Sequence, residues 1–122
     1  MKALFALSFL MLTLIGCAAF EPQSRAPFVG EWLYADKEQS CRYSFHADGS
    51  FSGEVSRHGE LISQFKGKWK VEPGALLYTY TGDVFKRIPP GTTDRDQVIQ
   101  MRRDSFLIQA ANGERRRYRR VR

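Results

Sequence analysis

Few side chains in this sequence are of the types that perform chemistry. The chain of 122 residues contains two cysteines, Cys17 and Cys41, and two histidines, His46 and His58. A structural zinc ion needs four ligands, and neither histidine has a second His or Cys at ligand spacing, so we interpret both as turn residues. No serine has the sequence context of an activated nucleophile. We therefore expect no catalytic residue, no metal site and no cofactor.

Cys17 follows an N-terminal segment that has the order of a secretory signal. Lys2 supplies a positive charge, Ala3 to Ile15 is apolar apart from one serine and one threonine, and Gly16 is small. A membrane-spanning helix needs about 20 apolar residues, and this run is shorter. The pattern therefore predicts a cleaved signal peptide over residues 1–16.

The residues Leu14-Ile15-Gly16-Cys17 resemble the lipobox of bacterial lipoproteins, in which the cysteine is acylated and the signal is cut before it. The resemblance implies that Cys17 begins the mature protein and carries its lipid chains. Several chains together anchor a protein, at about 0.8 kcal/mol for each buried CH₂ group. Ala18 stands where an Asp would signal inner-membrane retention, so we expect an outer-membrane anchor that faces the periplasm. The alternative is an ordinary signal cut near Ala18-Ala19, which leaves a soluble secreted domain.

Export limits the partners that the charge of the chain suggests. The net charge is +6 at pH 7, and a basic chain normally suggests nucleic acid as a partner. An exported protein does not meet nucleic acid, so we expect no such binding.

Within the envelope, Cys41 is the sole free thiol and has no partner for an internal disulfide. It shares an apolar strand face with Tyr43 and Phe45, so we expect a buried, unreactive side chain, with a redox or intermolecular role as the alternative.

Much of the positive charge lies in a C-terminal run of arginines: Arg115, Arg116, Arg117, Arg119, Arg120 and Arg122. The run alternates poorly, so both faces of the last strand carry guanidinium groups. Those that face inward must pair with an acid, stack on an aromatic ring or lie at the rim, because an unpaired buried charge is too costly. An outward row of Arg115, Arg117 and Arg119 would attract anionic headgroups, at about 1 kcal/mol each. A solvated strand that protects a sheet edge is the interpretation we favour over headgroup binding.

From residue 28 onward, apolar residues recur with a period of two, which predicts strands. We expect strands at about 28–35, 41–46, 51–56, 61–71, 75–81, 96–103, 105–110 and 114–122. The turns Ala47-Asp48-Gly49-Ser50 and Asn112-Gly113 join neighbouring strands. Residues 84–88 either continue the fifth strand or form another short one. Residues 89–95 form the longest loop, because a proline cannot donate to a sheet.

About eight strands without an amphipathic helix predict an all-β fold, a small antiparallel up-and-down barrel over residues 28–122 that follows a tether at 17–27. The barrel contains a repeated pattern, F-x-G-x-W. It occurs at Phe28-Val29-Gly30-Glu31-Trp32 and again at Phe65-Lys66-Gly67-Lys68-Trp69. We interpret the two copies as equivalent corners of one barrel, where the glycine lets neighbouring groups approach.

Several of these segments resemble the small bacterial lipocalin-like barrel domains: Gly30-x-Trp32, the hairpin at 45–51, Gly67-Lys68-Trp69-Lys70-Val71 and the arginine-bearing last strand. The resemblance covers residues 28–122 and implies a barrel that binds a ligand. The domain is shorter than a full lipocalin, so we expect a shallow pocket for a small apolar ligand, with its mouth at residues 89–95. Its candidate lining is Trp32, Tyr43, Trp69 and Tyr80. Core packing alone is the simpler explanation of these aromatic residues, and the one we favour.

Together these features predict a lipid-anchored protein of the cell envelope with a non-catalytic binding or envelope-associated role. The expected partners are the membrane through Cys17, anionic headgroups and a small apolar ligand. One alternative function is a small apolar-ligand carrier of lipocalin type. A second is an inhibitor of a periplasmic enzyme.

Overall fold

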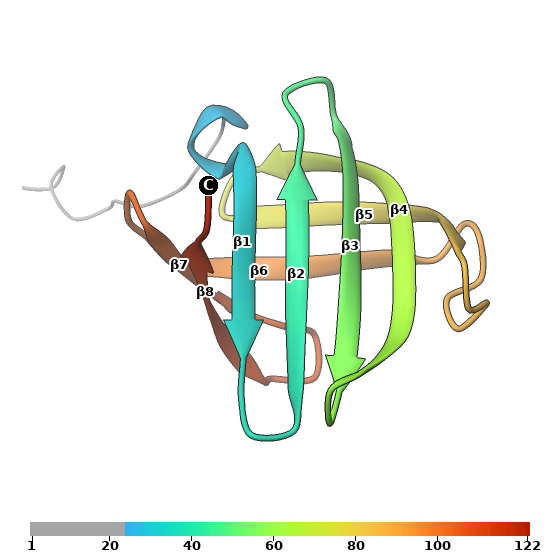
Figure 1. Cartoon of the computed structure of the whole chain (residues 1–122). Helices are drawn as coiled ribbons and strands as arrows, with labels where there is room; N and C mark the ends of the chain where they lie inside the picture. The colour runs from blue at the N-terminus through green and yellow to red at the C-terminus, as the bar shows by residue number, and fades with distance from the viewer. Residues whose placement is uncertain (1–23) are drawn as a thin grey trace, which may run out of the picture.

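The structure, a computed structural model, describes residues 24–122 and forms a closed barrel. The predicted signal peptide, Cys17 and most of the tether lie outside the described residues. A 3₁₀ helix, η2 (Ala26–Phe28), precedes eight strands. These are β1 (Gly30–Ala35), β2 (Gln39–Phe45), β3 (Ser50–Arg57), β4 (Glu60–Glu72), β5 (Ala75–Asp83), β6 (Thr93–Met101), β7 (Ser105–Gln109) and β8 (Arg115–Arg120). Each strand pairs antiparallel with the next and β8 returns to β1, which confirms the predicted all-β up-and-down barrel (Figure 1).

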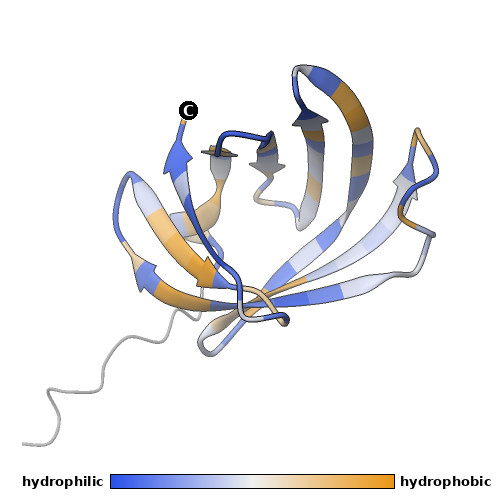
Figure 2. Cartoon of the chain, turned by 90° about the horizontal axis from the view of Figure 1, so that it is seen from below, coloured by the Kyte–Doolittle hydropathy of each residue, from blue (hydrophilic) through white to orange (hydrophobic). Residues whose placement is uncertain are grey.

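Aromatic side chains fill the interior of the barrel. Along β4, residues from Ser63 to Lys70 alternate strictly between buried and exposed, and Figure 2 shows bands of apolar and polar residues along several strands. Rings from different strands meet inside, with centroids 4.7 Å apart for Trp32 and Phe106 and 5.9 Å apart for Tyr43 and Tyr78. An eight-stranded barrel is just wide enough to be filled in this way, so packing of these rings stabilises the fold.

Most strand boundaries lie within two residues of the predicted ones, and three differences affect the architecture. Phe28 was expected in the first strand, but it ends η2, because Pro27 lacks a ladder donor and suits the first turn of a helix. Residues 84–88 form no strand, since β5 ends at Asp83. β6 begins at Thr93, where the ladder with β5 starts, so the expected loop at 89–95 is instead a loop over 84–92.

The tryptophans of the two F-x-G-x-W copies lie at the same end of the barrel, near η2, although the first copy runs from η2 into β1 and the second lies within β4. The Trp32 indole donates to the carbonyl oxygen of Phe28 at 2.8 Å, and the Trp69 indole donates to that of His46 at 3.0 Å. An arginine lies over each ring, Arg120 at 4.2 Å from the Trp32 centroid and Arg25 at 5.7 Å from that of Trp69. Each tryptophan thus fixes a segment that crosses this end, which we call the proximal end.

Gly67 allows β4 to bend between its two partner strands. The pairing of β4 with β5 shifts register between Lys66 and Gly67, and Figure 1 shows β4 curving over the barrel there. A Cβ atom at Gly67 would overlap the Thr79 carbonyl oxygen and lie 2.9 Å from the Phe51 ring. The first half of β4 therefore pairs with β3, and the second half turns to pair with β5 and close the barrel.

Candidate functional site at the distal rim

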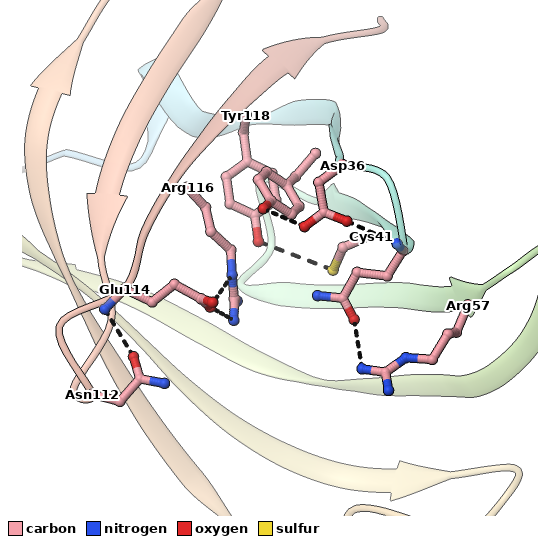
Figure 3. Close-up of polar contacts among 9 residues, drawn as sticks. Asp36, Cys41, Arg57, Asn112, Glu114, Arg116 and Tyr118 are labelled. Atoms are coloured by element: carbon pink, nitrogen blue, oxygen red, sulfur yellow. Dashed lines mark hydrogen bonds and ion pairs between the residues drawn. The ribbon is translucent and has the colours of Figure 1, made fainter.

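The end of the barrel away from η2, which we call the distal rim, gathers the polar side chains drawn in Figure 3. The turns that follow β1, β3 and β7 meet here. On β8 the alternation places Arg116 and Tyr118 inward, whereas Arg115, Arg117 and Arg119 are exposed. The inward residues of β8 therefore bring a guanidinium group to the rim.

Arg116 is half-buried and is held by an acid and an aromatic ring. Its Nε donates to Glu114 Oε1 at 2.9 Å, and its Nη2 pairs with the same oxygen. The guanidinium carbon lies 5.8 Å from the centroid of the Tyr34 ring. Burial is the largest single influence and lowers the pKa of Arg116, but the hydrogen bond and charge of Glu114 and the neighbouring Tyr118 together outweigh it, so the pKa lies above its ordinary value. Arg116 therefore stays charged.

Tyr34 connects Arg116 to the turn between β1 and β2. Its hydroxyl donates to Asp36 Oδ2 at 2.8 Å, while Asp36 Oδ1 accepts the backbone N–H groups of Glu38 and Gln39 at 2.9 Å. The bond to Asp36 raises the pKa of the Tyr34 hydroxyl. The bond from the Gln39 N–H, followed by that from Tyr34, lowers the pKa of Asp36. This side of the rim is an ordered turn with an ionised carboxylate.

Asp96 is a partly buried carboxylate on β6. Burial raises its pKa to about 6, and the neighbouring Tyr78 hydroxyl limits that rise. The charge of Asp94 raises the pKa further, and the charge of Arg116 lowers it. A carboxyl group with this pKa changes its protonation close to neutral pH, which allows it to donate or accept a hydrogen bond.

Cys41 lies below the rim and is 6% exposed. The Tyr118 hydroxyl donates to its Sγ at 4.0 Å. Burial raises the pKa of the Cys41 thiol to about 11. A thiol in this state is a poor nucleophile, because the thiolate is the reactive form. The buried position expected from the sequence is confirmed.

The four aromatic residues predicted to line a ligand pocket lie in two places. Tyr43 and Tyr80 meet in the core with their hydroxyl oxygens 3.5 Å apart. Trp32 and Trp69 lie at the proximal end, where both side chains are buried against backbone segments. The structure therefore brings the two tyrosines together and separates the two tryptophans from the distal rim.

The arginines of the last strand divide as their alternation requires. Outward Arg115 donates to Gln109 at 2.9 Å and Arg117 donates to Gln100 at 3.0 Å. Inward Arg116 pairs with an acid and inward Arg120 stacks on a ring, the solutions expected for buried guanidinium groups.

The sequence-based prediction nevertheless missed Arg116, Tyr34 and Asp96 as candidate site residues. The alternation of inward and outward side chains along each strand would have indicated them, because each one occupies an inward position near the rim.

Two further properties concern the residues that the structure describes. Among residues 24–122, no group of three or more His, Cys, Asp or Glu side chains is arranged to hold a metal ion. No helix within this part of the chain is long and apolar enough to cross a membrane.

Comparison with known proteins supports the fold. No family model matches the sequence, and no curated protein sequence matches it. Among solved structures, the barrel is similar to a lipocalin-like protein from Bacteroides uniformis ATCC 8492, with 17% sequence identity and a TM-score of 0.58. The match covers 78% of this chain and 99% of that protein. At this identity the likeness concerns the fold alone: the chain forms a lipocalin-like β-barrel of eight strands.

Proposed function

We propose that this protein is a lipid-anchored component of the cell envelope that binds a small ligand at the distal rim and catalyses no reaction. The observation that carries the binding proposal is Arg116, a charged and half-buried guanidinium group at the edge of an aromatic core. Glu114 engages only Nε and Nη2. Because a guanidinium group has five N–H donors, Arg116 retains donors for an acceptor on a ligand.

The packing of the interior favours a shallow site. Phe45, Phe51 and Phe106 are fully buried in the barrel, and a core filled by rings at close contact leaves a ligand to lie across the rim. Its polar group would face Arg116 and Asp96, and its apolar part would rest on the half-buried ring of Tyr34. This arrangement suits a small amphiphilic molecule.

The chemistry of the rim supports binding without catalysis. Cys41, the thiol nearest the rim, has a pKa of about 11 and is buried, so it is unsuited to attack a substrate. Asp96, with a pKa of about 6, changes its protonation near neutral pH. An acid or base without an activated nucleophile, a metal site or a second catalytic group beside it is a weak basis for an enzyme.

The lipocalin-like fold favours a second candidate function, the transport of a small apolar ligand. The two proposals differ in the expected ligand. A carrier would bind an apolar molecule through the rings of Tyr43 and Tyr80, whereas a rim site would depend on Arg116.

Native mass spectrometry of the full chain purified from its own cells distinguishes these functions. We expect a bound small molecule in the wild type and in Arg117→Leu, a control that removes an outward arginine of the same strand, and its loss in Arg116→Leu. A ligand retained in Arg116→Leu would support the carrier. A protein that carries no ligand in any variant would contradict both.

The anchor is supported by the resemblance of Leu14-Ile15-Gly16-Cys17 to a lipobox. Metabolic labelling with a fatty acid should label the wild type and not Cys17→Ala, and the labelled protein should fractionate with the outer membrane. An unlabelled wild-type protein would contradict the lipid anchor and leave the rim site to be judged separately.

A further inference from the structure

We propose that one face of the barrel, the outer face of β4 with the loop that follows β5, docks on a bilayer that contains anionic phospholipids. This β4 face is defined by Lys66, Lys68 and Lys70 on β4, by Arg25 before η2 and by residues 84–87 of the loop. The proposal deepens the proposed function, because it rests on the lipid anchor and states which surface the anchored protein turns toward the membrane.

The loop carries two exposed apolar side chains beside two cations. Val84 is 70% exposed and Phe85 is 45% exposed, and Lys86 and Arg87 follow them directly. Figure 1 shows this loop projecting from the side of the barrel beyond β4. Apolar side chains that enter the headgroup region, next to cations that pair with anionic lipids, are the elements of interfacial binding.

Asp83 holds this loop in one conformation. Its carboxylate accepts five hydrogen bonds: from Ser63 Oγ and from the backbone N–H groups of Gln64, Phe85, Arg87 and Ile88, at 2.7 to 3.2 Å. Lys86 adopts a left-handed backbone conformation, with φ at +59°. The apolar residues are therefore presented by a fixed turn, so binding does not require the loop to become ordered.

The loop is continuous with the lysine row of β4. The Val84 N–H donates to the Gln64 carbonyl oxygen at 2.8 Å, and Lys66 pairs with Gly82 across the two strands. Lys66, Gly82 and Val84 line one shallow groove of about 330 Å³. The first lysine of the row and the first apolar residue of the loop therefore share a surface.

The other end of the row reaches the start of the described chain. Lys68 and Lys70 line a groove of about 780 Å³ together with Arg25 and Arg95, and its acids are Asp48 and Asp94. The Asp48 carboxylate accepts hydrogen bonds from the N–H and the hydroxyl of Ser50. Lys70 also pairs with Glu72 at 3.9 Å, with both side chains well exposed. Cations outnumber acids in this groove, which favours an anionic partner.

The proposed lipid anchor at Cys17 favours the bilayer as the anionic partner of this groove. Arg25 follows Cys17 by eight residues, and a chain of this length spans no more than about 30 Å. An acylated Cys17 would therefore keep Arg25, and the groove that it lines, close to the headgroups. The outward row of Arg115, Arg117 and Arg119 belongs to β8, four strands from β4 in the closed ring. That row faces another direction when β4 faces the membrane, so the proposal replaces it as the headgroup contact.

The test uses the full acylated protein reconstituted into vesicles of phosphatidylcholine with or without phosphatidylglycerol. In one variant a tryptophan replaces Phe85 as the reporter, and in a control variant a tryptophan replaces Arg117. Brominated lipids quench the fluorescence of a tryptophan that enters the bilayer. The quenching of the wild-type protein, which contains Trp32 and Trp69, is subtracted as the background. We expect quenching of the Phe85→Trp reporter only in vesicles that contain phosphatidylglycerol, and none of the Arg117→Trp reporter.

Two charge-matched triple variants then compare the lysine and arginine rows. Replacing Lys66, Lys68 and Lys70 by Gln should lower the ratio of docked to undocked protein roughly tenfold or more. Replacing Arg115, Arg117 and Arg119 by Gln should leave it unchanged. Asp83→Asn, which loosens the loop without changing an exposed apolar residue, should reduce quenching of the same reporter.

The outcomes separate this proposal from the lipid anchor. An acylated protein whose Phe85→Trp reporter is not quenched, or is quenched equally in neutral vesicles, overturns the docking face while the anchor stands. Equal effects of the two triple variants overturn it as well. An unacylated protein whose reporter is quenched in anionic vesicles supports the face and contradicts the anchor.

Discussion

The guanidinium carbon of Arg120 lies 4.2 Å from the centroid of the Trp32 ring, and the same side chain donates to three backbone carbonyl oxygens. Two of these, on Pro27 and Val29, belong to the segment that enters β1, and the third, on Arg103, belongs to the turn between β6 and β7. One residue of the last strand thus fixes the proximal end of the barrel.

Arg120→Lys should destabilise the protein by about 2 kcal/mol. An ammonium group cannot stack as a plane on Trp32 or reach all three carbonyl oxygens at once. Arg119→Lys, at the neighbouring outward position, is the control and should change stability by no more than about 0.5 kcal/mol. Urea unfolding followed by tryptophan fluorescence measures both. Equal stabilities of the two variants would show that Arg120 does not fix this end.

Gly67→Ala should cost more than about 2 kcal/mol, because the new Cβ would overlap the Thr79 carbonyl oxygen where β4 bends. The matched substitution is Gly82→Ala on the paired strand, where a Cβ would meet no atom within 4 Å. We expect that change to lie within about 0.5 kcal/mol of the wild type. Thermal and urea unfolding of both variants test the comparison. A tolerated alanine at 67 would mean that β4 does not need this close approach.

Asp96 should make stability depend on pH in the opposite direction to most carboxylates. Its folded-state pKa is about 6, above its ordinary value of 3.8, so the folded state binds more protons between these values. The contribution of Asp96 to stability is therefore greatest at and below about pH 4 and falls as the pH rises through 6. Asp96→Asn should remove this loss and be more stable than the wild type at pH 7 by about 1 to 2 kcal/mol, with little difference at pH 4. A wild-type protein that gains stability relative to Asp96→Asn over this interval would contradict the assignment.

Cys41 should react with iodoacetamide only after unfolding. With a pKa of about 11, only about a thousandth of the thiol is ionised at pH 8, and the side chain is buried. Peptide mass spectrometry of the native protein should find Cys41 unmodified at pH 8 and fully modified in concentrated urea. Rapid modification of the native protein would show that the barrel opens at β2, which would also bear on how ligands enter.

The local features of this chain followed directly from its sequence. Apolar residues alternate with polar ones along β4, and Asp48-Gly49 and Asn112-Gly113 are strong turn signals, so the strands and their antiparallel order were predictable. The boundaries that failed, at Phe28 and at residues 84–92, lie where a proline or a pinned carboxylate competes with the strand pattern. The loop conformation depends on Asp83 meeting Ser63, a contact between strands that periodicity does not reveal.

The sequence by itself determined that the last strand turns guanidinium groups inward and that each must find a partner. Only the tertiary structure decided which partner each one has. Arg116 and Arg120 share one face of β8, yet Arg116 meets Glu114 and Tyr34 at the distal rim, whereas Arg120 lies on Trp32 at the proximal end. The reason is closure of the barrel: the register that pairs Trp32 with Arg120 joins the first strand to the last. That register depends on the pairing of the strands between them, which shifts at Val55/Ser56, Lys66/Gly67 and Val98/Gln100.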